Sequence, residues 1–370
     1  VIISSIVEDT YYIWRKFMDQ ITDQKFISVV GGVFITYNPK EFIGKADYIC
    51  RGEGDEVIPE LMDLISDGKD GHHLPNIYPN EMRPALNVNT LPPTDHEIFD
   101  KRSLYRPFQG RIIKVATVET QRGCPFRCKF CNSPSNAGLY KEETDSLFFR
   151  HRSVEHIEME IQHLIKTIDV EFLWIVTDTL LTTSKKKFDD FCDMYSKYKI
   201  PFFAQTRPEL LTPHQAKRLV EIGCEKLNMG VEHGDPQFRK DVIGRVYDNQ
   251  KAIDAFKIAR EAGLNTTCNF IVGYPYETME NCMKSVDLAA QLGCDDTNAF
   301  IFTPYHGTPM RSMCVDAGFI DKDLIVEMRS DDQGSFLDMP PPYMSKKDIQ
   351  YMFNNFVRLF RERERAIMSS

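Results

Sequence analysis

The sequence lacks the long apolar runs and the basic excess that define several common classes of protein. No uncharged apolar stretch approaches the ~18 residues that cross a bilayer, so we expect no membrane span. Asp and Glu (54) outnumber Lys and Arg (45), and the net charge of -9 argues against a nucleic-acid partner. The first seven residues have no basic region and no small-residue cleavage site, so we expect no signal peptide.

Cysteine is also scarce for a disulfide scaffold, with ten residues in a chain of 370. Seven of the ten are dispersed through mainly apolar segments, and we interpret them as small buried hydrophobes. This usage predicts a reducing, cytoplasmic environment. The dispersed residues are Cys50, Cys192, Cys224, Cys268, Cys282, Cys294 and Cys314.

The amino-terminal third alternates between strand and helix patterns. Residues 1–7, 26–30 and 46–50 are typical of strands, and residues 10–21 and 57–66 of helices. This alternation predicts a parallel, doubly wound sheet. Gly31 and Gly32 end the second strand, where either a turn with positive φ or the close approach of a ligand requires glycine. Residues 68–110, rich in Pro, Asn, Asp and His, are predicted to be a linker.

From residue 111 the same alternation continues through six βα units, which predict a partial (βα)6 barrel. Catalytic groups of such barrels lie at the carboxyl ends of the strands. The expected strands are 112–118, 171–176, 202–205, 226–230, 265–272 and 296–302, and the expected helices are 153–167, 184–198, 212–222, 249–262 and 279–292.

A final helix is predicted from residue 346 to about 367. Its apolar stripe consists of Ile349, Met352, Phe353, Phe356 and Phe360. This stripe fits either packing across the open side of the barrel or a substrate lid.

Three cysteines, Cys124, Cys128 and Cys131, follow the first barrel strand with the spacing C-x3-C-x2-C. A closed zinc site needs a fourth ligand, and a redox dithiol leaves one cysteine unexplained. Three thiolates suit a [4Fe-4S] cluster in which one iron keeps an open coordination site. Arg122, Arg127 and Lys129 are either solvated or positioned to offset the charge of such a cluster.

With Phe130 just before its last cysteine, this motif resembles the signature of the radical S-adenosylmethionine (radical SAM) superfamily. The resemblance implies that the three cysteines hold three irons and that SAM chelates the fourth. It also implies reductive cleavage of SAM to a 5'-deoxyadenosyl radical, with an electron donor such as flavodoxin or ferredoxin. Methyl transfer, cyclisation or rearrangement of a small molecule would follow.

The resemblance extends to further positions at the strand ends. Phe130 corresponds to the residue whose backbone meets adenine, Asp178 to a polar group near the methionine end, and Arg207 to a carboxylate-binding arginine. Glu232 corresponds to a glutamate near ribose. Other implied positions are Gly273, Tyr274 and Pro275 along adenine, with His306 as a substrate contact. No catalytic residue is assigned beyond these.

The amino-terminal segment resembles the second half of a cobalamin-binding domain, in the residues Val29 to Gly32 and Ala46 to Glu56. Gly31 and Gly32 would face cobalamin. In that family a D-x-H-x-x-G loop follows the first strand, and it is not found here, so we expect a truncated domain that binds cobalamin weakly or not at all.

The expected organisation is a partial cobalamin-binding-like domain (1–67), a linker (68–110), a radical SAM barrel (111–315) and a helical extension (316–370). The fold class is α/β, a partial TIM-like barrel preceded by half of a Rossmann-like domain. Two alternatives are a methylthiotransferase acting on tRNA or protein and a non-catalytic iron–sulfur protein. The first normally carries three cysteines in its leading domain, where residues 1–123 hold only Cys50.

Overall fold

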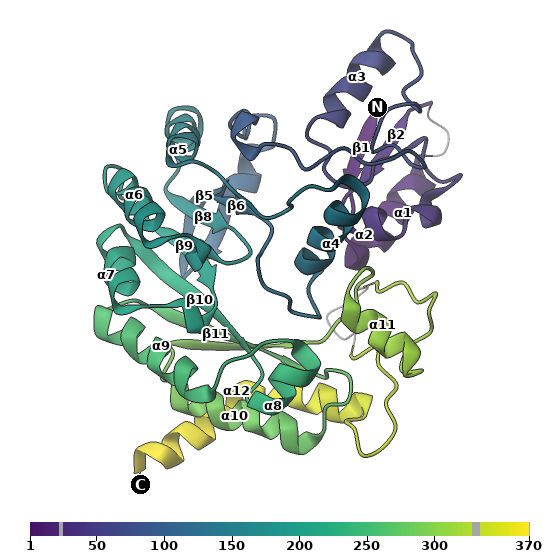
Figure 1. Ribbon diagram of the computed structural model, residues 1–370. Helices are drawn as coiled ribbons and strands as arrows, with labels where there is room; N and C mark the ends of the chain where they lie inside the picture. Colours follow the sequence, from purple (N-terminus) through teal and green to yellow (C-terminus); the bar gives the residue numbers. More distant parts are fainter. Residues whose placement is uncertain (22–24, 328–333, 370) are drawn as a thin grey trace.

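The computed structural model describes residues 1–21, 25–327 and 334–369. A small α/β unit is followed by a larger one, and Figure 1 shows the small unit at one end of the large one. Within the described ranges, none of the helices combines the length and the apolar character needed to cross a membrane.

The amino-terminal unit is a three-stranded parallel sheet in the order β1–β2–β3. The strand β2 is buried because its Val-Val run packs against helices on both faces. This arrangement confirms the predicted doubly wound half-domain. The elements are β1 (Ile2–Ser5), α1 (Tyr11–Gln20), β2 (Ser28–Gly31), α2 (Val33–Tyr37), β3 (Tyr48–Ile49) and α3 (Val57–Ser66).

The segment predicted as a linker has more structure than the sequence indicates. Leu74 and Ile77 are buried in the core of the amino-terminal unit. Near its end, β4 (Tyr105–Phe108) pairs antiparallel with β5 and becomes an edge of the large sheet. Pro107 masks this strand in the sequence, since proline is tolerated only where a strand needs no further partner.

The large unit is a seven-stranded curled sheet in the order β12–β11–β10–β9–β8–β5–β4. Its six parallel strands follow one another in chain order, which confirms the predicted half-barrel. They are β5 (Arg111–Glu119), β8 (Phe172–Val176), β9 (Phe202–Thr206), β10 (Cys224–Glu232), β11 (Thr266–Val272) and β12 (Asp296–Ile301).

Amphipathic helices cover the outer face of this sheet (Figure 1). They begin at side-chain caps such as Ser153, Thr212 and Thr278, as their sequences indicate. These helices are α5 (Val154–Ile168), α6 (Lys185–Tyr195), α7 (Pro213–Glu221), α9 (Asn249–Ala262) and α10 (Met279–Leu292). Shorter elements at the rim are β6 (Gln121–Arg122), β7 (Arg150–His151), α8 (Pro236–Phe238) and α11 (Pro309–Asp316).

The carboxyl-terminal helix α12 (Lys346–Ser369) packs on α10 and β12. Ile349, Met352, Phe356 and Phe360 are buried there, and Phe356 contacts Phe270 with ring centroids 5.3 Å apart. Phe353 lies outside the stripe, at 37% exposure. The contacts are those of core packing rather than of a lid. The predicted extension also includes residues 328–333 and 370, which lie outside the described residues.

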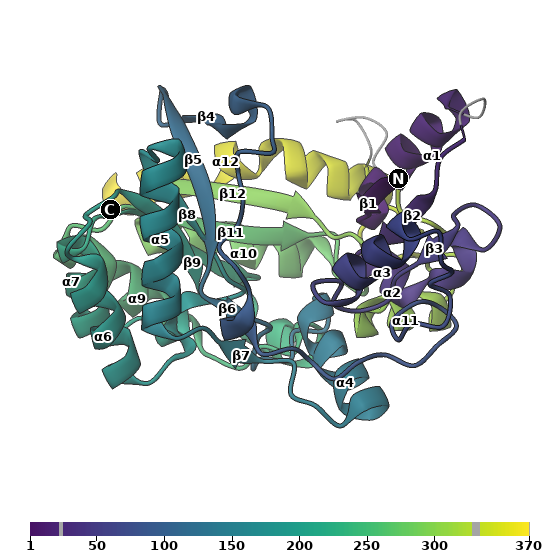
Figure 2. The same ribbon diagram turned by 90° about the horizontal axis from the view of Figure 1, so that it is seen from above.

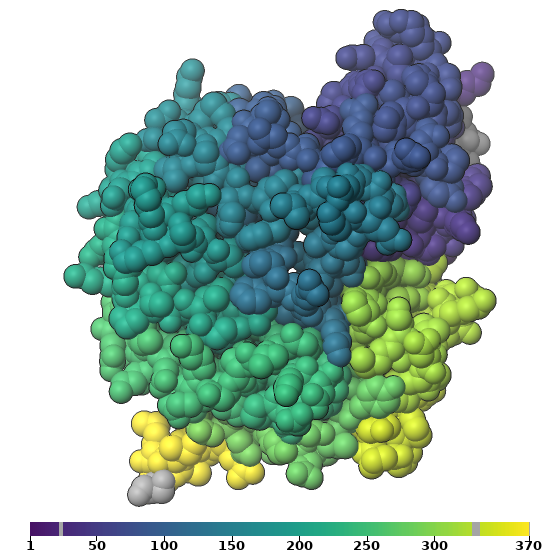
Figure 3. Space-filling model, viewed as in Figure 1, coloured from purple at the N-terminus to yellow at the C-terminus, as the bar shows by residue number. Residues whose placement is uncertain are grey.

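The two units meet at the carboxyl ends of the barrel strands. In Figure 2 the arrows of β11 and β12 point toward the amino-terminal unit. Figure 3 shows that unit beside the yellow-green segment around α11, along one edge of the barrel. The contact is tight, because a Cβ added at Gly307 would lie 2.3 Å from the Tyr37 ring.

Candidate functional site

The cysteine loop connects β5 to a helix, α4 (Asn132–Thr144), that begins directly after Cys131. Gly123, at φ +86°, lets the loop pass within contact of Phe148, where a Cβ would meet the ring at 2.9 Å. The Lys129 N–H donates to the Ile243 carbonyl, and the Lys129 carbonyl accepts from the Met310 N–H, both at 2.9 Å. The loop is therefore held by backbone from two distant parts of the barrel rim.

Cys124, Cys128 and Cys131 all line one cavity of about 250 Å³, here called the cysteine cavity. The cavity is bounded by groups from four successive barrel strands and from the rim. Its other lining residues are Phe126, Phe130, Ser133, Pro134, Asp178, Gln205, Thr206, Arg207, Asn228, Gly230, Glu232, Arg245 and Asn269.

Two buried arginines face the middle thiol. Arg207 Nη1 and Arg245 Nε each donate to Cys128 Sγ at 3.3 Å. Guanidinium donors stabilise negative charge on the sulfur that accepts from them. Burial raises the pKa of Cys124 to about 11 and that of Cys131 to about 12.

The bases expected around the thiols lie elsewhere. Arg122 is held by Glu53, Asp55 and Glu119, and Lys129 Nζ donates to the Asp241 carbonyl at 2.7 Å. Arg127 is exposed. Of the two alternatives for these bases, compensation of the thiols is not seen. The groups that face Cys128 are Arg207, directly after β9, and Arg245, after the turn Arg239–Ile243.

The donor set fits an iron–sulfur cluster with a polar ligand beside it. Among the residues that the structure describes, no three His, Cys, Asp or Glu side chains converge as a mononuclear metal site would require. A cluster makes no such demand, because each thiolate binds a different iron. Asn228 Oδ1 is buried at this cavity and has no hydrogen-bond partner among the described residues, which suits a polar ligand.

Phe130, Asp178, Arg207 and Glu232 line the cysteine cavity together. Asp178 follows β8 and accepts from the Ser133 hydroxyl at 2.7 Å. Arg207 follows β9 and lies over the Phe126 ring, 3.7 Å from its centroid. The four side chains that the resemblance singles out are thus brought to one place, although their contacts with SAM stay a prediction.

Glu232 ends β10 with φ +72°, which is uncommon for a residue other than glycine. Its Oε1 lies 3.3 Å from Arg245 Nη2. Burial raises the pKa of Glu232, while Arg245 and Arg207 oppose that shift. Strained backbone of this kind is concentrated at functional sites.

Gly273, Tyr274 and Pro275 lie beside the cysteine cavity and do not line it. Gly273 has φ +81°, and the N–H groups of Gly273 and Tyr274 donate to Glu277 Oε2. Tyr274 is fully buried, with its ring centroid 6.1 Å from that of Phe130. This loop therefore supports Phe130 from behind.

His306 lies at the contact between the two units. Its Nδ1 is 2.7 Å from Glu8 Oε1, and its N–H donates to Glu8 Oε2 at 2.8 Å. It lines a separate cavity of about 220 Å³, together with Phe34 and Tyr305. Its role as a substrate contact stays a prediction.

Gly31 is the last residue of β2, and Gly32 follows it directly before α2. Gly32 has φ +109°, and a Cβ there would lie 2.7 Å from the Ile6 carbonyl oxygen. The turn and the backbone of the chain thus account for this glycine without a ligand. A Cβ at Gly31 would meet only Cys50, at an ordinary 3.6 Å, so the contact of the two glycines with cobalamin stays a prediction.

Sequence reasoning missed Arg245 and the ionic contact between the units. Arg245 follows a π-helical turn, Arg239–Ile243, whose charged residues are typical of an exposed loop. Glu53, in the amino-terminal unit, accepts from Arg122 at 2.8 Å and from Arg150 at 2.6 Å. The sequence feature that could have indicated this contact is the alternation of glycines and acidic residues from Arg51 to Glu56.

The concave face of the half-barrel continues below the cysteine cavity. Trp174 and Val176 are 43% and 46% exposed there, while Ile175 between them is buried beneath the helices. Trp174 meets Phe203 edge to face, with centroids 5.4 Å apart. Gln205, Asn228 and Asn269 add carboxamides along the neighbouring strands. The face combines aromatic surface with neutral hydrogen-bonding groups.

Residues 118–289 match the family model described as the radical SAM superfamily. The chain is 27% identical over 318 residues to an uncharacterized methyltransferase of Pyrococcus horikoshii, covering 82% of this chain and 66% of that protein. It is 27% identical over 298 residues to the bacteriochlorophyllide d C-8(2)-methyltransferase of Chlorobaculum tepidum, covering 79% and 63%.

Among solved structures, the fold matches the radical SAM methyltransferase TsrM from Kitasatospora setae, bound to cobalamin and a [4Fe-4S] cluster. The TM-score is 0.64 at 17% identity, covering 85% of this chain and 64% of that one. The chain thus spans just under two thirds of the length of these proteins. The cysteine motif and the family match agree, and residues 118–289 of the chain are similar to the radical SAM superfamily.

Proposed function

We propose that this chain is a radical SAM enzyme that acts on a small-molecule substrate, with methyl transfer, cyclisation or rearrangement as the outcome. One observation carries the proposal. Three cysteines of a single loop share a cavity with Asp178, Arg207 and Glu232, which come from three successive strand ends. A family motif alone would not require those distant side chains to meet.

In this proposal Cys124, Cys128 and Cys131 hold a [4Fe-4S] cluster, and SAM binds beside it. When bound, the cluster and SAM supply one-electron cleavage of the sulfonium and a 5'-deoxyadenosyl radical. The role of the protein is to bind and orient SAM and the substrate and to shield them from solvent. Arg207 and Arg245 offset negative charge at Cys128, and Arg207 is also suited to a carboxylate.

The other side chains have positioning roles. Glu209 accepts from Arg207 Nε at 2.6 Å and so orients its guanidinium. The buried pair of His233 and Glu277, 3.0 Å apart, fixes the loop that carries Gly273. Hydrogen-bond donors that are already fixed in position need no reorganisation when charge develops in the site.

The substrate in this proposal lies against the concave face. The exposed Trp174 and the carboxamides beside it favour a planar molecule with hydrogen-bonding edges. The names of the relatives, which include methyltransferases, support methyl transfer. We also propose a cytoplasmic location and a flavodoxin or ferredoxin as electron donor. The location is supported by ten free cysteines, which persist in reducing compartments.

The test is anaerobic reconstitution of the chain with iron and sulfide, followed by reduction in the presence of SAM. We expect about four irons per chain and the formation of 5'-deoxyadenosine. Cys128→Ala should abolish both. Cys192→Ala, which removes a fully buried thiol of the barrel core, is the matched control and should retain both. A wild-type chain that loads iron without cleaving SAM would contradict the proposal.

A further inference from the structure

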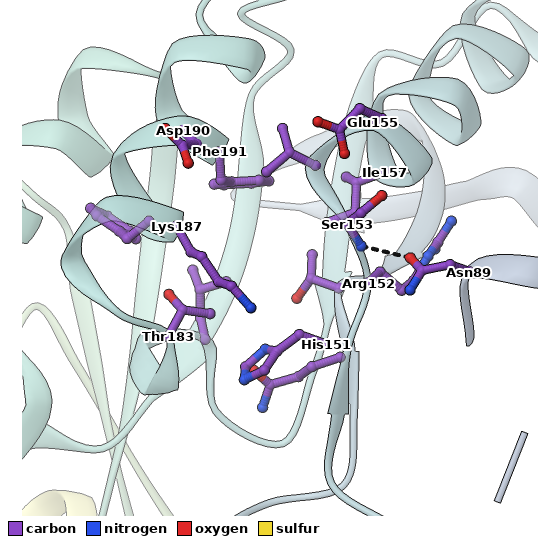
Figure 4. Close-up of a pocket in the computed structure, with 15 residues that line it drawn as sticks. Asn89, His151, Arg152, Ser153, Glu155, Ile157, Thr183, Lys187, Asp190 and Phe191 are labelled. Carbon is purple, nitrogen blue, oxygen red and sulfur yellow. Dashed lines mark hydrogen bonds between the residues drawn. The ribbon is translucent and has the colours of Figure 1, made fainter. Parts of the chain in front are cut away.

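Another cavity lies on the side of the barrel rim, between the amino ends of α5 and α6. Its volume is about 350 Å³, larger than the cysteine cavity, and it is here called the lateral cavity. Figure 4 shows the side chains of His151, Lys187 and Thr183 around its lower part. The apolar walls are Val154, Ile157, Leu180, Phe188 and Phe191.

The wall of the lateral cavity contains a buried hydroxyl, that of Thr120, without a hydrogen-bond partner in the described ranges. Thr120 is only 8% exposed, and its hydroxyl has no hydrogen-bond partner among the described residues. Burying a hydroxyl without a partner is costly, so such a group in a cavity wall points to a ligand. Thr120 lies between β5 and the cysteine loop, and its backbone is fixed by a 3.0 Å bond from the Arg152 N–H to its carbonyl.

Lys187 provides a positive charge at the same place. Lys185 and Lys186, its neighbours on α6, are each paired with an aspartate four residues on. For Lys187 the structure shows no carboxylate within ion-pair distance in the described part of the chain, and Phe191 takes the corresponding position. In Figure 4 the Lys187 amine extends toward the His151 ring. Burial, and to a lesser degree the nearby charge of Lys187, lower the pKa of His151.

Two helices of 15 and 11 residues, α5 and α6, also begin at this cavity. Their amino ends add positive potential from their first N–H groups. The acidic lining residues, Glu155 and Asp190, lie at the other end of the cavity in Figure 4. Asp190 is neutralised there by Lys186 at 2.7 Å. The Lys187 end is therefore the end that attracts an anion.

We propose that the lateral cavity is a second ligand site, distinct from the cysteine cavity, for a small organic anion with an apolar body. The carboxylate or phosphate group would bind Lys187 Nζ and the Thr120 hydroxyl, and the apolar part would lie between Phe188 and Phe191. This site does not depend on the radical chemistry proposed above.

The probe for this site is phenyl phosphate, with inorganic phosphate and phenol as its two halves. Binding is measured by calorimetry and by the unfolding midpoint, on the reconstituted chain with SAM present so that the cysteine cavity is filled. We expect saturable binding of phenyl phosphate, at least about tenfold tighter than that of either half, because the two parts bind together.

Two variants test the assignment. Lys187→Ala should weaken phenyl phosphate at least about tenfold, while Lys186→Ala, one residue away with the same charge, should leave it unchanged. Thr120→Val should weaken binding about fivefold without lowering the unfolding midpoint of the ligand-free chain, because its hydroxyl has no partner to lose. Equal effects of the two lysine variants, a Thr120→Val variant that binds as wild type, or no binding of phenyl phosphate would each overturn the proposal.

Discussion

Replacing Glu53 by alanine should loosen the cysteine loop, although Glu53 belongs to the other unit. Its carboxylate is 11% exposed and accepts from Arg122, from both Nη atoms of Arg150, and from the Leu86 N–H. After the change Arg122 keeps Asp55 and Glu119 as partners. Arg150, however, would have no carboxylate partner left among the described residues, and would keep the carbonyls of Leu86 and Phe148 and the Phe148 ring.

The loss of stability follows from this difference between Arg122 and Arg150. Removing one partner of a buried ion pair costs ~3–5 kcal/mol, because the other charge is left without compensation. Since Arg150 is 14% exposed, we take the lower end of that range. A loss of ~3 kcal/mol in local stability corresponds to a roughly 100-fold fall in protection against hydrogen exchange.

Hydrogen exchange measured by mass spectrometry on peptides from the cysteine loop and from β7 provides the assay. Glu143→Ala is the matched control, since Glu143 also pairs across the units, with Arg51 at 2.8 Å, but is 30% exposed. It should change protection by less than about fivefold, as surface pairs do. Equal effects of the two variants would refute the reasoning. The reasoning would also be refuted if the stability losses of Glu53→Ala and Arg150→Ala added up within ~0.5 kcal/mol in the double variant.

Three further predictions concern single contacts. Asp235 has its pKa lowered to about 2, against the effect of burial, by Lys284 and by helix N–H groups. The ionised Asp235 therefore stabilises the folded state above pH ~4, and this contribution is lost as the pH falls through about 2. Asp235→Asn should cost ~1.5 kcal/mol at pH 7 in urea unfolding, and the difference should vanish toward pH 2; a constant difference would contradict this. Gly234→Ala should unfold the rim, because its Cβ would lie 2.1 Å from the Lys284 carbonyl oxygen. The control is Gly263→Ala, at φ +81° with open space around the added Cβ, which should cost only ~1 kcal/mol. Similar unfolding midpoints of the two variants would argue against the close packing at Gly234. Arg245→Gln should speed the loss of iron from the reconstituted chain to a chelator about tenfold. An unchanged rate would show that Arg245 does not stabilise the proposed cluster.

The alternation of strand and helix was sufficient to predict the barrel, because each helix has an apolar stripe and a polar cap. The helix α4 was missed for the opposite reason. Only Ser133 and Tyr140 are buried on it, so it has no apolar periodicity to detect. Its first turn depends instead on Cys131 Sγ, which accepts from the Ser133 N–H.

The candidate site divides in the same way. The cysteines and the residues at the carboxyl ends of strands β8, β9 and β10 were predicted, because strand ends of a parallel sheet meet at one rim. Arg245 was not, since it follows an irregular turn and reaches the rim only through Gly244 at φ +80°. Glu53 was missed because its partners are 69 and 97 residues away, in a different unit.

The order of the strands has a consequence for synthesis of the chain. The sheet grows in one direction, so the cysteine loop leaves the ribosome before the arginines that face it. Arg207 follows Cys128 by 79 residues and Arg245 by 117. At ~5–20 residues per second, Cys128 is made roughly 4–25 s before its two guanidinium partners. During that interval Cys128 lacks both guanidinium partners, so we expect the three thiols to be most open to oxidation and to other metals before Arg245 has been made.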